Sequence, residues 1–210
     1  MRRLPVYLVL DTSGSMHGEP IESVTNGVQT MQAALQRDPH ALGTAYLSVI
    51  TFGGNVRQVL PLTEVSQFVP PPLAASGDTP LGRALTEVAN CVKRDVVKRT
   101  KDEEGDWKPL VFLMTDGEPT DNIESGINEF KSVKWGNVIA CAAGPAANTS
   151  VLQRLTENVV KLDTADSTSI AAYFKWVTSS ISLSSKGVDE SGDSGSNQLP
   201  PPPPEISLIK

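Results

Sequence analysis

Short apolar runs alternate along the chain with longer stretches in which apolar residues recur every three or four positions. The short runs predict strands at residues 6–10, 45–52, 110–114, 138–142 and 159–162. The periodic stretches predict helices at residues 21–35, 81–96, 123–130 and 170–181, with Asp121 as a cap for the helix at 123–130. Residues 56–62 follow a Gly-Gly-Asn turn, which favours a hairpin and hence one antiparallel edge strand.

Strands that are separated by helices and show little polar alternation indicate a parallel sheet that is buried on both faces. We therefore expect a doubly wound α/β domain over residues 1–184, with a mostly parallel sheet, one antiparallel edge strand and helices on both faces. A chain of 210 residues is long enough for one such domain with a sizeable core.

The composition changes after residue 184. Residues 185–198 are rich in Ser, Gly and Asp and predict a disordered linker, because they offer little apolar surface to bury. The final residues, LPPPPPEISLIK, predict an extended polyproline II spacer with a short apolar end. We expect residues 185–210 to be a disordered linker and tail; the alternative is that the tail is the element that docks to a partner.

Composition and charge set outer limits on function. The net charge of -6, with 20% charged residues, gives no electrostatic reason to expect nucleic acid as a partner. No apolar run approaches the roughly 20 residues of a membrane span, and no cleavage site of a secretory signal follows the N-terminal apolar run. Cys91 and Cys141 predict buried free thiols. We expect a cytoplasmic protein with no membrane partner.

Acids and hydroxyls follow the predicted strands at three places. Asp11, Ser13 and Ser15 come directly after the first strand. Thr79 lies just before the helix that begins near residue 80, and Asp116 follows the strand at 110–114. Because ligands bind at the carboxyl edge of a parallel sheet, where the strand order reverses, we expect these side chains to meet there.

The chemistry of this set points to a hard metal ion. Two carboxylates and three hydroxyls suit Mg²⁺ or Mn²⁺, whereas Zn²⁺ favours imidazole or thiolate. The two-residue spacing places Ser13 and Ser15 on the same side of an extended loop, so both could face one ion. The neighbouring polar residues are better explained as surface charges, rim residues or caps, and these are Asp78, Glu118, Asp121 and His17.

The set resembles the metal-ion-dependent adhesion site of von Willebrand factor A domains: Asp11-x-Ser13-x-Ser15, Thr79 in GDTPLG and Asp116 in TDG. The resemblance implies a Rossmann-like fold and direct coordination of the ion by Ser13 and Ser15. It implies that Asp11 and Asp116 lie close to the ion, and that Thr79 joins or leaves the coordination sphere as its loop shifts. It also implies that a Glu or Asp of a protein partner completes the coordination, so that the domain binds rather than catalyses.

Within the family, the stretches LPVYLVLDTSGSM and GDTPLGRAL most resemble the TerY-like proteins of bacterial tellurite-resistance and stress clusters. That resemblance implies a regulatory or scaffolding protein that acts with a protein kinase and a PP2C-type phosphatase. Some of these relatives carry a C-terminal metal-binding module, where this chain has its Pro-rich tail.

The main enzymatic alternative is a Mg²⁺-dependent phosphotransferase or phosphatase of the haloacid-dehalogenase kind, with Asp11 as nucleophile. Such enzymes resemble Asp-x-Asp, and this chain has Ser13 at the second acidic position, so proton transfer lacks its agent. A serine hydrolase would need a glycine-flanked nucleophile, and a nucleotide-binding fold would need GxGxxG or a P-loop lysine. The sequence therefore favours a protein without enzymatic activity.

Overall fold

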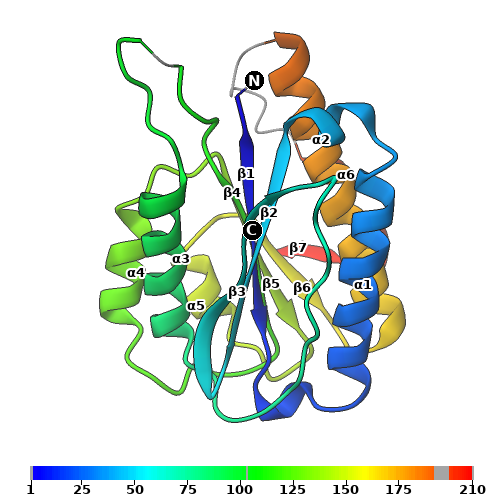
Figure 1. Cartoon of the computed structure of the whole chain (residues 1–210). Helices are drawn as coiled ribbons and strands as arrows, with labels where there is room; N and C mark the ends of the chain where they lie inside the picture. The colour runs from blue at the N-terminus through cyan, green and yellow to red at the C-terminus, as the bar shows by residue number, and fades with distance from the viewer. Residues whose placement is uncertain (1, 103, 192–198, 210) are drawn as a thin grey trace.

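A seven-stranded sheet forms the centre of the computed structural model, which describes residues 2–102, 104–191 and 199–209. The strands are β1 (Leu4–Asp11), β2 (Ala45–Gly53), β3 (Asn55–Glu64), β4 (Leu110–Thr115), β5 (Asn137–Ala143), β6 (Val159–Leu162) and β7 (Ser207–Ile209). The helices are η1 (Gly14–Met16), α1 (Glu19–Leu35), α2 (Pro39–Thr44), α3 (Leu81–Asp95), α4 (Glu124–Lys131), α5 (Thr149–Gln153) and α6 (Ser167–Ser191). Helices α1, α2 and α6 lie on one side of the sheet and α3, α4 and α5 on the other (Figure 1).

The strand order is β3-β2-β1-β4-β5-β6-β7, so β1 lies between two parallel neighbours, β2 and β4. The chain moves outward from β1 to β3 and then crosses back to β4, which makes the β1–β4 pair the point where the strand order reverses. This arrangement confirms the predicted doubly wound, mostly parallel sheet, with β3 as its antiparallel edge strand.

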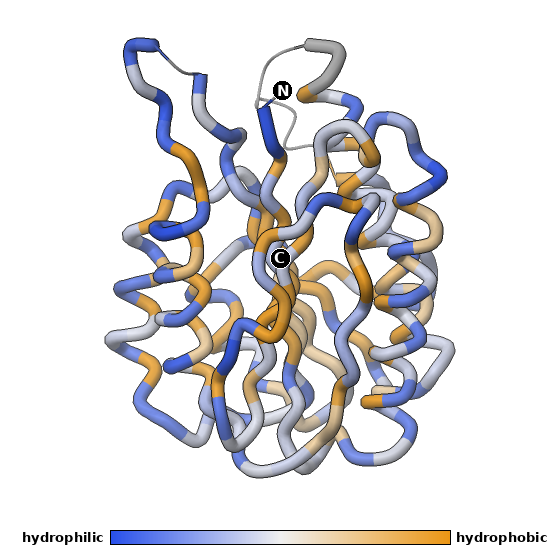
Figure 2. The backbone as a smooth tube through the Cα atoms, viewed as in Figure 1, coloured by the Kyte–Doolittle hydropathy of each residue, from blue (hydrophilic) through white to orange (hydrophobic). Residues whose placement is uncertain are grey.

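All eight residues of β1 are buried, because the strand carries apolar side chains toward both layers of helices. Leu8 and Leu10 face the core shared with α1 and α6, whereas Tyr7 and Val9 face the core shared with α3 and α4. Figure 2 shows the hydrophobic positions gathered along the central strands. The predicted free thiols, Cys91 and Cys141, are both buried.

The C-terminal part differs from the expected disordered linker. Helix α6 continues to Ser191, and its buried face extends beyond residue 184 through Ser185 and Val188. Residues 199–209 lie against the domain, and β7 forms a second antiparallel edge strand that the sequence did not predict. Residues 192–198 of the expected linker lie outside the described residues.

Two short helices were also missed by periodicity. The Asp38 side chain accepts from His40 N and Ala41 N at the start of α2, and the Asn148 side chain accepts from Val151 N at the start of α5. Both helices are too short for a repeating apolar pattern. None of the helices within the described ranges is long and apolar enough to cross a membrane.

Close packing of α1 on α6 depends on Gly27. A Cβ atom at this position would lie 2.3 Å from Cδ2 of Phe174, so Gly27→Ala forces the buried ring out of place. We expect this substitution to lower the free energy of unfolding by about 1–3 kcal/mol in urea denaturation. The control is Asn26→Ala at the exposed neighbouring position, which should change stability by less than about 0.5 kcal/mol. Equal effects of the two variants would contradict the packing role of Gly27.

Candidate metal centre

Backbone hydrogen bonds fasten together the loops that follow β1 and β2 and the segment that leads into α3. Ser76 N donates to Thr12 O at 2.8 Å, and Gly14 N donates to Gly77 O at 2.9 Å. Gly77 has a φ of +75°, and a Cβ on it would lie 2.5 Å from Cα of Gly54, so only glycine allows the loops to approach this closely. Residues 76–79 are thereby held beside the end of β1.

Four of the five predicted side chains form one hydrogen-bonded cluster. Ser13 Oγ and Ser15 Oγ lie 3.0 Å apart, and Ser15 Oγ donates to Asp116 Oδ1 at 2.8 Å. Ser13 N donates to Asp11 Oδ1 at 2.8 Å, which turns the carboxylate back toward its own loop. The cluster therefore joins residues that are about a hundred positions apart in the sequence.

The fifth residue, Thr79, lies beside the cluster. A Cβ on Gly117 would be 3.7 Å from Thr79 Oγ1, which places this hydroxyl next to the residue that follows Asp116. The Thr79 backbone is held by Thr120, which accepts from Thr79 N at 3.1 Å and donates from its own N to Thr79 O at 3.0 Å. Of the five predicted residues, Thr79 is thus the one whose side chain takes no part in the hydrogen bonds described for the cluster.

Thr115 is a residue of the centre that the sequence reasoning missed. It is the last residue of β4, and its hydroxyl donates to Asp11 Oδ2 at 2.6 Å across the β1–β4 pair. The available signal was a hydroxyl immediately before Asp116, just beyond the strand predicted at 110–114. Together Thr115 and Ser13 N leave the Asp11 carboxylate with two fixed hydrogen bonds.

Asp121 caps a different helix from the one expected. Its two carboxylate oxygens accept from Gly82 N and Arg83 N, both at 2.8 Å, in the first turn of α3. Helix α4 begins at Glu124, and its N-cap residue, Ile123, makes no side-chain capping hydrogen bond. The loop after β4 therefore supports the helix that follows Thr79, and the prediction that Asp121 caps its own helix is wrong.

The remaining acids near this edge are exposed. Glu118 accepts from Asn148 Nδ2 at 2.8 Å, and Asp78 accepts from Thr120 Oγ1 at 3.3 Å. His17 is exposed as well. Among the described residues, no group of three or more His, Cys, Asp or Glu side chains is arranged to hold a metal. A metal at this edge would thus rely on two carboxylates and on hydroxyls.

The two carboxylates of the cluster are buried, and a buried negative charge requires a compensating positive charge. Asp11 is 0% exposed and Asp116 is 9% exposed, whereas Ser15 is exposed. Among the described residues, no ion pair includes either acid. Burial raises the pKa of the Asp11 carboxyl and of the Asp116 carboxyl above the usual range, although hydrogen bonds from Ser13 and Ser15, respectively, oppose the shift. A divalent cation would balance two such charges, so the donor set fits a metal ion.

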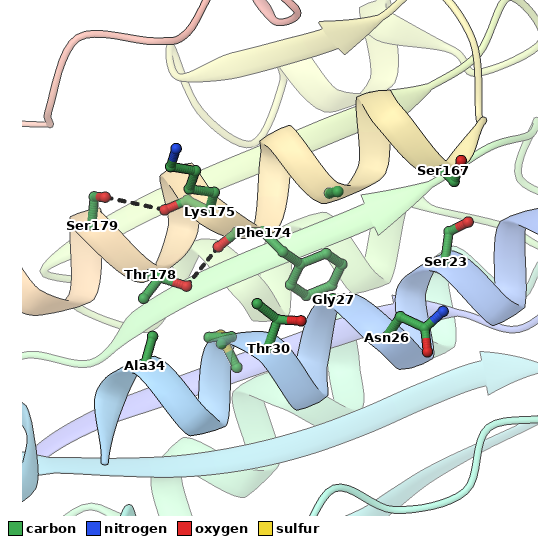
Figure 3. Close-up of a pocket in the computed structure, with 12 residues that line it drawn as sticks. Ser23, Asn26, Gly27, Thr30, Ala34, Ser167, Phe174, Lys175, Thr178 and Ser179 are labelled. Carbon is green, nitrogen blue, oxygen red and sulfur yellow. Dashed lines mark hydrogen bonds between the residues drawn. The ribbon is translucent and has the colours of Figure 1, made fainter. Parts of the chain in front are cut away.

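A separate hollow of about 600 Å³ lies between α1 and α6. Figure 3 shows the Phe174 ring over Gly27 at its floor, with Thr30 and Asn26 along one wall. The residues that line it include no Asp, Glu, His or Cys, so it offers no metal-binding set.

A family model for the von Willebrand factor type A domain matches residues 6–173. The chain belongs to this family. The match spans every strand of the sheet except the C-terminal β7, and it includes all five predicted site residues. No curated protein matches the sequence of the chain.

Solved structures share the fold at low sequence identity. Proximal thread matrix protein 1 from the mussel byssus, with a zinc-occupied MIDAS motif, is 16% identical with a TM-score of 0.60; the match covers 85% of this chain and 48% of that one. The ArnB paralog VWA2 from Sulfolobus acidocaldarius is 15% identical with a TM-score of 0.61, covering 86% and 45%. The pilus adhesin SpaC from Lactobacillus rhamnosus GG is 16% identical with a TM-score of 0.66, covering 87% and 31%. The match thus spans less than half of each of these structures.

The raised pKa of Asp11 predicts a pH dependence of stability in the presence of a chelator. The folded protein holds the Asp11 proton more tightly than the unfolded chain, so this residue favours folding at low pH and loses that contribution as pH rises through the folded pKa. The free energy of unfolding of Asp11→Asn, measured relative to that of the wild type, should therefore increase as the pH rises from about 4 to neutrality.

Urea denaturation across this pH range measures the difference. The control is Asp78→Asn, which removes an exposed carboxylate and should follow the wild type at each pH. A difference between Asp11→Asn and the wild type that stays constant with pH would contradict the effect of burial.

Proposed function

We propose that this chain is a metal-dependent protein-interaction module in which the Asp11 cluster holds a divalent cation for a partner's carboxylate. The observation that carries the proposal is the pair of buried acids, Asp11 and Asp116, which are linked through the backbone N and hydroxyl of Ser13 and the hydroxyl of Ser15. None of the ion pairs found among the described residues includes either acid. Family membership supports it, because adhesion proteins such as the pilus adhesin SpaC share this fold.

Each side chain has a proposed role toward the ion. Ser13 and Ser15 would contribute hydroxyl oxygens, Asp11 and Asp116 would neutralise the charge, and Thr79 would contribute the hydroxyl that lies beside the cluster. Two carboxylates balance a divalent ion without an excess of negative charge, so a further carboxylate from outside would be attracted. The exposure of Ser15 leaves this side of the cluster open to a partner.

The ion that we propose is Mg²⁺ or Mn²⁺, because oxygen ligands dominate the set. The mussel protein with zinc in its MIDAS motif makes Zn²⁺ the appropriate third ion to compare. When bound, the ion would supply a positive centre for an incoming carboxylate. This function requires no turnover, and we propose that the chain is not an enzyme.

The finer proposal concerns partners and place. The motifs LPVYLVLDTSGSM and GDTPLGRAL support a TerY-like regulatory or scaffolding role with a protein kinase and a PP2C-type phosphatase, in tellurite resistance or stress signalling in the cytoplasm. In that role, a Glu or Asp side chain of one of these partners would complete the coordination of the ion.

Removal of one buried acid should abolish metal binding. We expect Mg²⁺ or Mn²⁺ to raise the melting temperature of the wild type, because a ligand that binds only the native state stabilises it. Asp116→Asn and Ser15→Ala should lose most of this increase and should show at least about tenfold weaker binding in calorimetry. Asp78→Asn, which changes the exposed acid beside Thr79, should keep both. Unchanged binding in Asp116→Asn would remove the basis of the proposed function.

Partner capture should depend on the metal and on Asp11. Immobilised wild-type protein should retain partners from a bacterial lysate in the presence of Mg²⁺. A chelator should release these partners, and immobilised Asp11→Ala should fail to retain them. Mass spectrometry identifies the captured proteins. A kinase or a PP2C-type phosphatase among the metal-dependent partners would support the finer proposal. Capture that survives both treatments would contradict the metal-dependent model.

Turnover of a phosphatase substrate that requires Mg²⁺ and is lost in Asp11→Asn would instead favour the haloacid-dehalogenase alternative.

A further inference from the structure

The C-terminal residues 199–209 lie along the edge of the sheet and across α6. Strand β7 pairs antiparallel with β6, with Val160 opposite Leu208 and Lys161 opposite Ser207 (Figure 1). The strand is only three residues long, and the five prolines before it have no N–H to donate. Backbone hydrogen bonds therefore hold this segment at few points, and its side chains and carbonyl groups must provide much of the attachment.

Trp176 is the polar anchor for the proline run. Its indole Nε1–H donates to Pro200 O at 2.8 Å, and its side chain is 3% exposed. Pro200, Pro201 and Pro203 border a cavity of about 270 Å³ together with Trp176 and Lys175 of α6. Recognition of proline-rich segments uses this combination of a preformed extended ligand and an aromatic side chain with a hydrogen-bond donor.

Apolar residues anchor the end of the segment. Ile206 is 4% exposed and belongs to the core shared with α1 and α6, whereas Ile209 packs against the core on the other side of the sheet. Leu208, between them, is 40% exposed. An added edge strand is recognised in the same way, since backbone pairing provides affinity and pockets for particular side chains provide specificity.

We propose that the β6 edge and Trp176 form a peptide-recognition site for an extended, proline-led segment with an apolar strand at its end. The chain's own residues 199–209 fill this site in cis, and the same residues of a second copy can replace them. In the chain, residues 192–198 connect the end of α6 to this segment. Such a tether raises the local concentration of the segment, so cis occupancy prevails in dilute protein.

The decisive experiment cuts this connection in the full chain. Residues 192–198 are replaced by a seven-residue protease recognition sequence, folding is checked by circular dichroism, and the protein is then cleaved. We expect native mass spectrometry to find the released C-terminal peptide still bound at tens of micromolar, about the range of weak peptide recognition. A labelled synthetic peptide LPPPPPEISLIK should exchange with it.

Matched variants separate recognition from nonspecific attachment. Ile206→Ser in the labelled peptide should weaken binding by about tenfold or more, because it removes a buried side chain. Leu208→Ser, a similar change at the exposed position, should change binding by less than about threefold. Trp176→Phe in the domain keeps an aromatic ring but removes the hydrogen-bond donor to Pro200 O. This substitution should weaken the binding of the released peptide and of the labelled peptide.

Two results would overturn the proposal. If the cleaved peptide leaves and the labelled peptide does not bind at about 1 mM, a typical effective concentration for a tether, the segment is held only by its covalent connection. If cleavage unfolds the domain, or the peptide neither leaves nor exchanges, residues 199–209 are a permanent part of the fold. A dimer of uncleaved protein that forms at high concentration and is lost in Trp176→Phe would support exchange between copies.

Discussion

The hydrogen bond between Thr115 and Asp11 connects the fold to its candidate site. It crosses the β1–β4 pair at the carboxyl end of both strands, where the strand order reverses. A carboxylate that is fully buried at this place requires fixed donors, and Thr115 Oγ1 and Ser13 N provide them. The rest of the cluster continues from this carboxylate, because Ser13 bonds to Asp11 through its N and to Ser15 through its hydroxyl, and Ser15 donates to Asp116.

Long-range contacts support the cluster from outside. Gly77 brings the loop before α3 against the loops after β1 and β2, and Asp121 satisfies the N–H groups at the start of α3. The loop that provides Asp116 therefore also determines where the helix after Thr79 begins. A conformational change in any one of these loops would displace the others, because they share hydrogen bonds and their backbones are in close contact.

The two proposed sites use different parts of the same sheet. The acids and hydroxyls lie at the carboxyl ends of the central strands, whereas the C-terminal segment occupies the side of β6 and the face of α6. In our proposals, the first site recognises a charged group and the second recognises an extended backbone with apolar side chains. An interaction module with both could hold a partner through its metal edge while its own C-terminus protects an exposed strand edge.

The sequence by itself determined the layered fold, because buried parallel strands and amphipathic helices leave periodic apolar patterns in neighbouring residues. It also indicated Asp11, Ser13, Ser15, Thr79 and Asp116, since loops after parallel strands must meet at one edge. Only the tertiary structure decided that Thr115 holds Asp11, that Asp121 caps α3, and that residues 199–209 pair with β6. Each of these contacts joins residues that are far apart in the chain, and a local pattern carries no information about a partner that folding alone brings near.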